Sequence, residues 1–349
     1  MDDVSPKGVF PLRIRKIIEE TGDAKSFVLE TVDGKPLQYT AGQFLTFVFN
    51  KDNGKQERRN YSLSSLPGSE PVITVKRIPN GEYSRFLFDH AKEGDLLQTI
   101  GASGFFTLPG NRTSYRQYVF FAAGSGITPV MALAREILSH AEDTKVLLVY
   151  SNRSLDSAIY YKQLLELQEQ HANRFRIDFL FSDAAHVEQK RMGVYVLEKI
   201  LAEHVLQPVS EQIYYLCGPF EYMRMITIIL KNNGVPAAQI RRETFTIEVP
   251  AHKPQPADQD EHTIHVTLSD KTYRFKSRYP QTILQAAKAV QIPMPFSCEA
   301  GQCGTCAATC ISGNVFMWRN DVLLDEEIAK GRVLTCTGYA VGGDVVLQV

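Results

Sequence analysis

The chain has 349 residues, of which 44% are hydrophobic and 22% charged, and its formal net charge is −1. These values predict a soluble globular protein of two or three domains. The net charge near zero argues against a nucleic-acid binder, which typically has an excess of basic residues. No apolar run is long enough to span a membrane, and the acidic N-terminus lacks the apolar stretch of a signal peptide. We therefore expect a cytoplasmic protein.

The first segment, residues 1–112, is predicted to fold as short strands separated by turns. Pairs such as Asp33–Gly34 and Asn53–Gly54 are typical of the turns between such strands. Regular short strands favour an antiparallel β-barrel, here with one short helix after Gly81. The expected strands are Pro11–Ile18, Ser26–Glu30, Phe44–Phe49, Val72–Arg77 and Leu96–Ile100, and the expected helix is Ser84–His90.

The second segment, residues 113–249, alternates apolar strands with helical stretches. This alternation predicts a parallel sheet whose strands are joined by crossover helices, which is an α/β fold. The expected strands are Tyr118–Ala123, Val146–Tyr150 and Gln212–Leu216, and the expected helices are Pro129–His140 and Glu221–Asn232.

A proline-rich stretch, residues 250–262, separates this segment from the last one, residues 263–349. The stretch holds three prolines and shows neither strand nor helix periodicity, so we predict a linker. The last segment is predicted to be an α+β domain. Its expected strands are Thr263–Leu268, Lys271–Phe275 and Asp344–Val349, and its expected helix is Thr282–Val290.

Five of the six cysteines lie in the last segment, and four of them have a distinctive spacing. Cys298, Cys303 and Cys306 follow the pattern C-x4-C-x2-C, and Cys336 comes thirty residues later. This is the plant-type ligand spacing of a 2Fe–2S cluster, in which two thiolates bind each iron. Glycines at positions 301 and 304 allow tight turns that direct backbone N–H groups toward the sulfurs.

Another interpretation of these cysteines fits the sequence less well. A zinc-binding interaction protein would favour two short Cys-x2–4-Cys pairs, and Cys336 has no near partner in the sequence. Cys310 lies outside the spacing and is expected to be a small buried residue. Residues 263–349 thus resemble a plant-type ferredoxin domain, which implies a β-grasp fold.

A short motif in the first segment, Arg59-Asn60-Tyr61-Ser62, resembles the R-x-Y-S flavin motif of the ferredoxin–NADP reductase superfamily. The resemblance implies that Arg59 pairs with a pyrophosphate, that Tyr61 stacks on the isoalloxazine, and that Ser62 is a catalytic residue near the reactive N5. The start of a helix can hold a phosphate through its free N–H groups. Further FAD contacts are expected at Val75, Lys76, Gly81 and Ser84.

A glycine-rich turn in the second segment follows a predicted strand and opens a predicted helix. Its glycines, Gly124 and Gly126, would let the backbone approach a pyrophosphate, and Pro129 suits a first helical turn. The pattern G-x-G-x-x-P resembles the superfamily's own nicotinamide-binding turn. Gly124, Gly126, Thr128 and Pro129 are therefore expected to bind NAD(P)H.

Two later strand ends are expected to complete the nicotinamide site. Cys217, Gly218 and Pro219 resemble the superfamily's C-G-P element, which implies a catalytic thiol beside the point of hydride transfer. The strand ending near Tyr150 lacks the acid that usually holds the ribose of NAD, whereas Ser151 and Arg153 could hold a 2′-phosphate. NADPH is therefore favoured, and NADH stays possible.

The order of flavin, nicotinamide and ferredoxin segments predicts an electron relay. A nicotinamide gives up two electrons as hydride and a 2Fe–2S cluster takes one, so the flavin must act between them. The whole chain resembles the reductase subunits of bacterial phenylacetyl-CoA epoxidases, which implies FAD, NADPH, a di-iron oxygenase partner and a role in aromatic catabolism.

Two alternative functions stay open on the sequence. A reductase of the phthalate-dioxygenase type would have the same domain order, but would use FMN and NADH and would feed a Rieske oxygenase. A non-catalytic redox sensor or electron carrier is the alternative of another class, and intact flavin and nicotinamide motifs argue against it.

Overall fold

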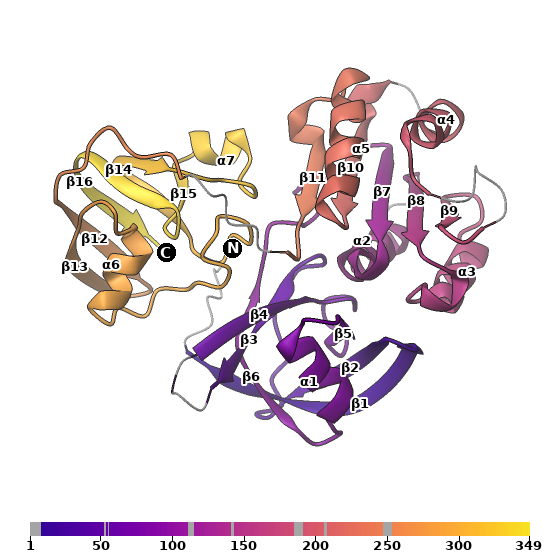
Figure 1. Ribbon diagram of the computed structural model, residues 1–349, viewed down its shortest axis with the longest axis horizontal. Coiled ribbons are helices and arrows are strands. Elements are labelled where there is room, and N and C mark those ends of the chain that lie inside the picture. The colour runs from indigo at the N-terminus through magenta and orange to yellow at the C-terminus, as the bar shows by residue number, and fades with distance from the viewer. Residues whose placement is uncertain are drawn as a thin grey trace. The chain divides into compact units, whose positions relative to one another are not determined.

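A computed structural model describes residues 8–51, 54, 56–110, 115–140, 143–184, 191–205, 208–246 and 253–349. Three sheets organise the chain (Figure 1), as the sequence predicted. By their contacts the residues form two compact units. One consists of Pro6–Ala102 and Phe106–Phe245, and the other is formed mainly by Ser103–Phe105 and Thr246–Val349.

The first sheet is antiparallel and has six strands in the order β4-β3-β6-β1-β2-β5. An antiparallel bridge between Leu63 and Ile73 links the ends of the order, which closes the sheet into the predicted barrel. Along β1, Leu12 and Ile14 are buried while Arg13 between them is exposed, the alternation of a half-buried strand. The elements are β1 Phe10–Thr21, β2 Ala24–Thr31, β3 Phe44–Asn50, β4 Gln56–Ser62, β5 Val72–Lys76, α1 Glu82–His90 and β6 Leu96–Ser103.

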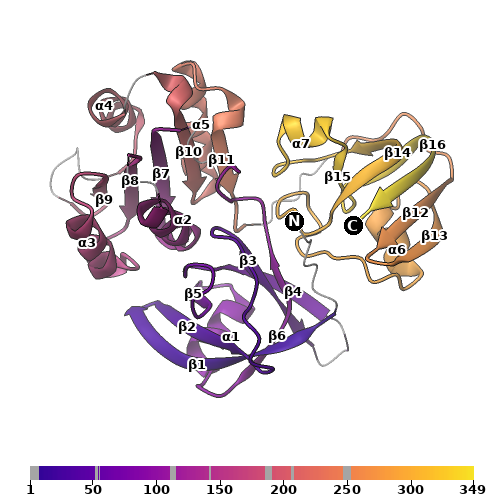
Figure 2. The same cartoon turned by 180° about the vertical axis from the view of Figure 1, so that it is seen from behind.

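The second sheet is parallel, with the strand order β11-β10-β7-β8-β9. Helices α2 and α3 cover one face and α4 and α5 the other (Figures 1 and 2), because successive strand residues are apolar on both faces. The elements are β7 Gln117–Ala123, α2 Ile127–His140, β8 Lys145–Asn152, α3 Tyr161–Gln170, β9 Phe175–Phe181, α4 Val194–His204, β10 Gln212–Cys217, α5 Phe220–Asn232 and β11 Ile240–Glu243. The strand order reverses between β7 and β10, so a crevice for ligands is expected at their carboxyl ends.

The third sheet has the order β13-β12-β16-β14-β15 and packs against helix α6. The side chain of Thr282 accepts a hydrogen bond from the Gln285 N–H and thereby caps that helix at its predicted start. The elements are β12 His262–Leu268, β13 Lys271–Ser277, α6 Ile283–Ala289, β14 Ala307–Met317, α7 Asp325–Ala329, β15 Arg332–Leu334 and β16 Gly338–Gln348.

The part of the predicted linker that the structure describes, residues 253–262, is held against the third sheet's unit. The Asp258 carboxylate accepts hydrogen bonds from the Gly342 N–H at 2.5 Å and from the His262 ring at 2.7 Å. The Lys253 ammonium lies 5.0 Å from the centroid of Trp318. Residues 250–252 lie outside the described residues. Within the described ranges, no helix has the length and apolar character needed to cross a membrane.

Candidate functional site

Strand β4 brings the predicted flavin motif to the start of helix α1. The Arg59 guanidinium lies 4.7 Å from the ring centroid of Tyr83 in the first turn of α1, and its Nη2 is 2.7 Å from Glu57 Oε2. Tyr83 stacks on Phe49, and its buried hydroxyl has no hydrogen-bond partner among the described residues. A guanidinium and a helix N-terminus side by side suit a phosphate-containing ligand.

The other predicted flavin residues have distinct surroundings. Val75 is fully buried in the barrel core, so only its backbone is available to a ligand. The ammonium of Lys76 lies 3.4 Å from Asp23 Oδ2. Ser84 is buried, and its Oγ donates to the Gly81 carbonyl at 3.1 Å, which ties down the start of α1. A Cβ on Gly81 would lie 2.3 Å from that Oγ, so the capping position has no room for a side chain.

The glycine turn after β7 packs directly against the neighbouring strand. A Cβ on Gly126 would lie 2.0 Å from the Cys217 carbonyl oxygen, so α2 can begin this close to β10 only with glycine there. Gly124 has φ +55°, and the position of its absent Cβ is open space. Thr128 Oγ1 donates to the Ser125 carbonyl at 3.0 Å, and Pro129 lies in the first turn of α2.

The predicted 2′-phosphate residues lie at the carboxyl end of β8 and just beyond it. Ser151 is half-buried, with its Oγ 3.5 Å from the Tyr222 hydroxyl, and Arg153 is exposed. On the adjacent side of β7, Gly218 packs against Ala123, where a Cβ would approach to 2.9 Å, and Pro219 is the N-cap of α5. The predicted nicotinamide residues therefore gather at one edge of the parallel sheet.

Ser62, Cys217 and Glu243 come together at this edge of the parallel sheet. Cys217 is opposite Glu243 in the parallel pairing of β10 and β11, and both are the last residues of their strands. Ser62 Oγ, at the end of β4, donates to Glu243 Oε2 at 3.3 Å. The barrel and the parallel sheet thus contribute to one buried polar group.

Burial dominates the proton affinities of this group. Desolvation raises the pKa of Glu243 to about 8, and the hydrogen bond from Ser62 opposes that rise. Desolvation and the neighbouring Glu243 raise the pKa of the Cys217 thiol well above its ordinary value. At neutral pH the thiol is therefore protonated, and Glu243 is mostly protonated as well.

Glu243 was not predicted from the sequence. Its strand, β11, has only four residues and follows a turn, so it shows little periodicity. The available signal was an acid at the end of a short strand, at the edge of the sheet where ligands bind.

The four predicted iron ligands converge from a loop and from the turn between β15 and β16. The Ala300 N–H donates to Cys298 Sγ at 3.4 Å, and the Cys298 N–H lies 3.5 Å from Cys303 Sγ. Cys303, Cys306 and Cys336 are all buried. Gly301 and Gly304 both have φ +74°, which the tight loop requires.

These thiols perturb one another's protonation, as expected for a ligand set. Hydrogen bonds from neighbouring thiols lower the pKa of Cys298 and of Cys306, whereas those of Cys303 and Cys336 are raised. No group of three or more His, Cys, Asp or Glu side chains within the described ranges is arranged for a single metal ion. A 2Fe–2S cluster instead takes two thiolates on each of two irons. Four thiols with N–H groups directed at sulfur fit such a cluster.

Cys310 stands apart from this set. It lies on β14, and its thiol donates to the Ser312 carbonyl at 3.4 Å. Partial burial raises its pKa.

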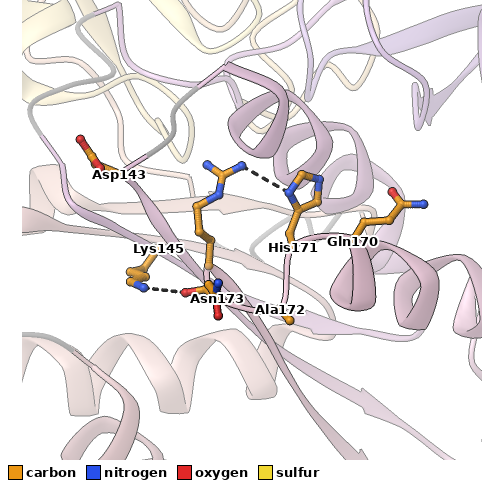
Figure 3. A pocket seen from close by; sticks show the side chains of 7 residues that line it. Asp143, Lys145, Gln170, His171, Ala172 and Asn173 are labelled. Carbon is orange, nitrogen blue, oxygen red and sulfur yellow. Dashed lines mark hydrogen bonds between the residues drawn. The ribbon is translucent and has the colours of Figure 1, made fainter.

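A separate hollow of about 460 Å³ lies at the opposite end of β8 (Figure 3). Lys145, the first residue of β8, donates to the Asn173 carbonyl at 2.5 Å, and Arg174 Nη2 is 3.3 Å from His171 Nδ1. Burial and the Arg174 charge lower the pKa of His171. Because parallel sheets bind ligands at their carboxyl ends, this hollow is distinct from the predicted nucleotide site.

Two known sequence families match the chain. The oxidoreductase NAD-binding domain matches residues 120–227, and the 2Fe-2S iron-sulfur cluster binding domain matches residues 266–341. These ranges cover the parallel sheet from β7 into α5, and most of the third sheet.

Relatives match over nearly the whole length. The ferredoxin reductase component of 3-ketosteroid-9-alpha-monooxygenase from Rhodococcus rhodochrous is 30% identical, over 93% of this chain and 92% of that one. One of the subunits of 1,2-phenylacetyl-CoA epoxidase from Escherichia coli K12 is 28% identical, over 97% of this chain and 96% of that one.

Solved structures of oxygenase reductases and related proteins match nearly the whole chain as well. Phthalate dioxygenase reductase is 26% identical with a TM-score of 0.59, covering 98% of both chains. An intact type IV self-sufficient cytochrome P450 monooxygenase is 25% identical with a TM-score of 0.72, and the match spans 98% of this chain but 41% of that one. The chain therefore belongs to the family of oxygenase reductase components, NAD(P)H-dependent oxidoreductases that combine a flavin with a 2Fe–2S cluster.

Proposed function

We propose that this chain transfers hydride from NADPH to FAD and delivers the electrons singly, through a cluster on Cys298, Cys303, Cys306 and Cys336, to an oxygenase. The observation that carries the proposal is the junction of Ser62, Cys217 and Glu243 at the carboxyl end of β10, the strand that borders the point where the strand order of the parallel sheet reverses. That is the place where such sheets bind nucleotides, and the flavin motif ends there.

The side chains at this junction position the reactants. When bound, a flavin accepts a hydride and can release its electrons one at a time, and a 2Fe–2S cluster carries one electron. Tyr61 offers its ring to the flavin, and Ser62 offers its hydroxyl near the reactive atom. Cys217 and Glu243, both protonated at neutral pH, place neutral groups where a nicotinamide ring would stack. A neutral, water-excluding wall suits hydride transfer, in which no proton is exchanged with solvent.

Two arguments support FAD and NADPH in particular. Arg59 lies beside the N-terminus of α1, and two adjacent anion-binding elements suit a pyrophosphate, which FAD has and FMN lacks. Arg153 and Ser151, near the end of β8, offer a cation and a hydroxyl to a 2′-phosphate.

For the acceptor we propose the oxygenase of a ring-1,2-phenylacetyl-CoA epoxidase, as for the E. coli relative. The competing acceptor is a monooxygenase acting on a steroid, as named for the R. rhodochrous relative. Purified chain mixed with each oxygenase and its substrate separates them, because only the cognate pair couples NADPH oxidation to product. Four reduced thiol ligands suit a reducing compartment, so we place the reaction in the cytoplasm.

The electron route is tested by replacing one ligand. Cys303→Ser is expected to abolish reduction of cytochrome c while NADPH still bleaches the flavin absorbance. Cys310→Ser is the matched control, because Cys310 lies outside the ligand set, and it should behave as the wild type. Undiminished cytochrome c reduction by Cys303→Ser would contradict the route. Mass analysis of the extracted flavin separates FAD from FMN.

A further inference from the structure

A three-residue segment far from the cysteines in sequence belongs to their unit. Ser103–Phe105 groups with Thr246–Val349, although the chain on both sides of it, Pro6–Ala102 and Phe106–Phe245, forms the other unit. Nothing in the cysteine spacing predicts such a contribution, which depends on the contacts of two side chains, Phe105 and Ser103.

The Phe105 ring covers the cysteine loop at Gly304. A Cβ on Gly304 would lie 2.4 Å from Phe105 Cδ2, so the ring rests against the loop where a side chain would otherwise stand. Gly304 is the residue directly after Cys303. Phe105 also packs against the core of the third sheet's unit, and the Arg332 guanidinium lies 5.7 Å from its ring centroid. The ring is therefore a fixed apolar cover over the ligand loop.

Ser103 reaches the same loop through a hydroxyl chain. Its Oγ lies 3.0 Å from Thr305 Oγ1, which lies 3.4 Å from Cys303 Sγ. A thiolate ligand can only accept hydrogen bonds. With Cys303 bound to iron, the Thr305 hydroxyl therefore donates to the sulfur, and Ser103 donates to Thr305, which polarises that bond further.

From these contacts we propose that Ser103 and Phe105 are positioning residues for the cluster, which set its reduction potential in opposite directions. The inference rests on the proposed function, since it requires the cluster. Reduction adds negative charge, which hydrogen bonds to the sulfurs stabilise and an apolar, water-excluding ring disfavours. Removing the Ser103 hydroxyl should therefore lower the potential, and removing the Phe105 ring should raise it.

The experiment is a potentiometric titration of the full-length, iron-loaded protein, followed by the electron paramagnetic resonance signal of the reduced cluster. Ser103→Ala should make cluster reduction at least threefold less favourable, and Phe105→Ala at least threefold more favourable, each about 28 mV for a one-electron couple. Ser103→Thr keeps the hydroxyl and should restore the wild-type potential. Ser312→Ala and Ile311→Ala, at exposed positions of β14 in the same unit, are the matched controls and should not shift it.

The outcomes separate this inference from the proposed function. A wild-type protein without the reduced-cluster signal would overturn the proposed function itself. A normal wild-type signal with both variants at the wild-type potential, or with both shifted in the same direction, would overturn the inference alone. Phe105→Leu keeps an apolar side chain over Gly304 and should give an intermediate shift, which covers the case in which Phe105→Ala cannot retain iron.

Discussion

Glu243 offers the sharpest test of the site, because a buried carboxyl must leave a signature in the pH dependence of stability. Its pKa is raised from 4.5 to about 8 by desolvation, with Ser62 as its hydrogen-bond donor. The folded protein therefore holds a proton that the unfolded chain releases above pH 4.5. The contribution of Glu243 to the free energy of unfolding accordingly falls as pH rises through this window, and it is level below 4.5 and above about 8.

The magnitude follows from the pKa difference. Each pH unit inside the window lowers the free energy of unfolding by up to about 1.4 kcal/mol, which gives about 2 kcal/mol between pH 6 and pH 8. Glu243→Gln keeps the shape and an acceptor for Ser62 but cannot ionise. The variant should therefore gain stability relative to the wild type by that amount over those two pH units.

The assay is urea unfolding of the full-length, cofactor-loaded protein at several pH values. Release of flavin fluorescence reports on the unit that contains Glu243, whereas the single tryptophan, Trp318, reports on the other unit. Glu221→Gln, an exposed acid in the first turn of α5, is the matched control. A difference between wild type and Glu243→Gln that stays constant from pH 6 to pH 8 would refute the reasoning, as would an equal change in the Trp318 transition.

Three further perturbations follow from the geometry. Gly126→Ala should destabilise the protein by roughly 1–3 kcal/mol and weaken NADPH binding, because the added Cβ would meet the Cys217 carbonyl. Thermal unfolding and the KM for NADPH measure these effects, and Gly22→Ala, where the space is open, is the control. Arg153→Gln should raise KM for NADPH at least tenfold and leave that for NADH nearly unchanged, and an equal effect on both would rule out a 2′-phosphate contact. N–H groups of Asp260 and Gly342 lower the pKa of Asp258 from 3.8 to about 2, so its carboxylate stabilises the folded state above pH 3.8 and loses that effect as pH falls to about 2. The melting temperature of Asp258→Asn should therefore be lower than that of the wild type at neutral pH and should approach it in that acidic window. Melting temperatures that do not converge there would count against the contact.

Element positions were largely predictable, because apolar periodicity is a local property. The predicted helix Ser84–His90 begins two residues earlier, at Glu82, since Gly81 is its N-cap. The last strand was expected at Asp344–Val349 but begins at Gly338. Gly342 and Gly343 have positive φ and interrupt the strand pattern in the sequence, whereas β16 pairs with β14 on both sides of them, across an irregularity in the register.

The amino-acid sequence by itself predicted the ligand set of the cluster and the nucleotide turn. Most of these residues lie a few positions apart, so spacing constrains the backbone: three cysteines in one loop with a fourth thirty residues later, and a glycine turn between a strand and a helix. Only the tertiary structure brought Glu243 to Ser62 and Phe105 to Gly304. Ser62 and Glu243 are 181 positions apart, and Phe105 and Gly304 are carried by different segments of the chain. Such pairs meet through sheet register and through the path of the chain, which no local sequence pattern encodes.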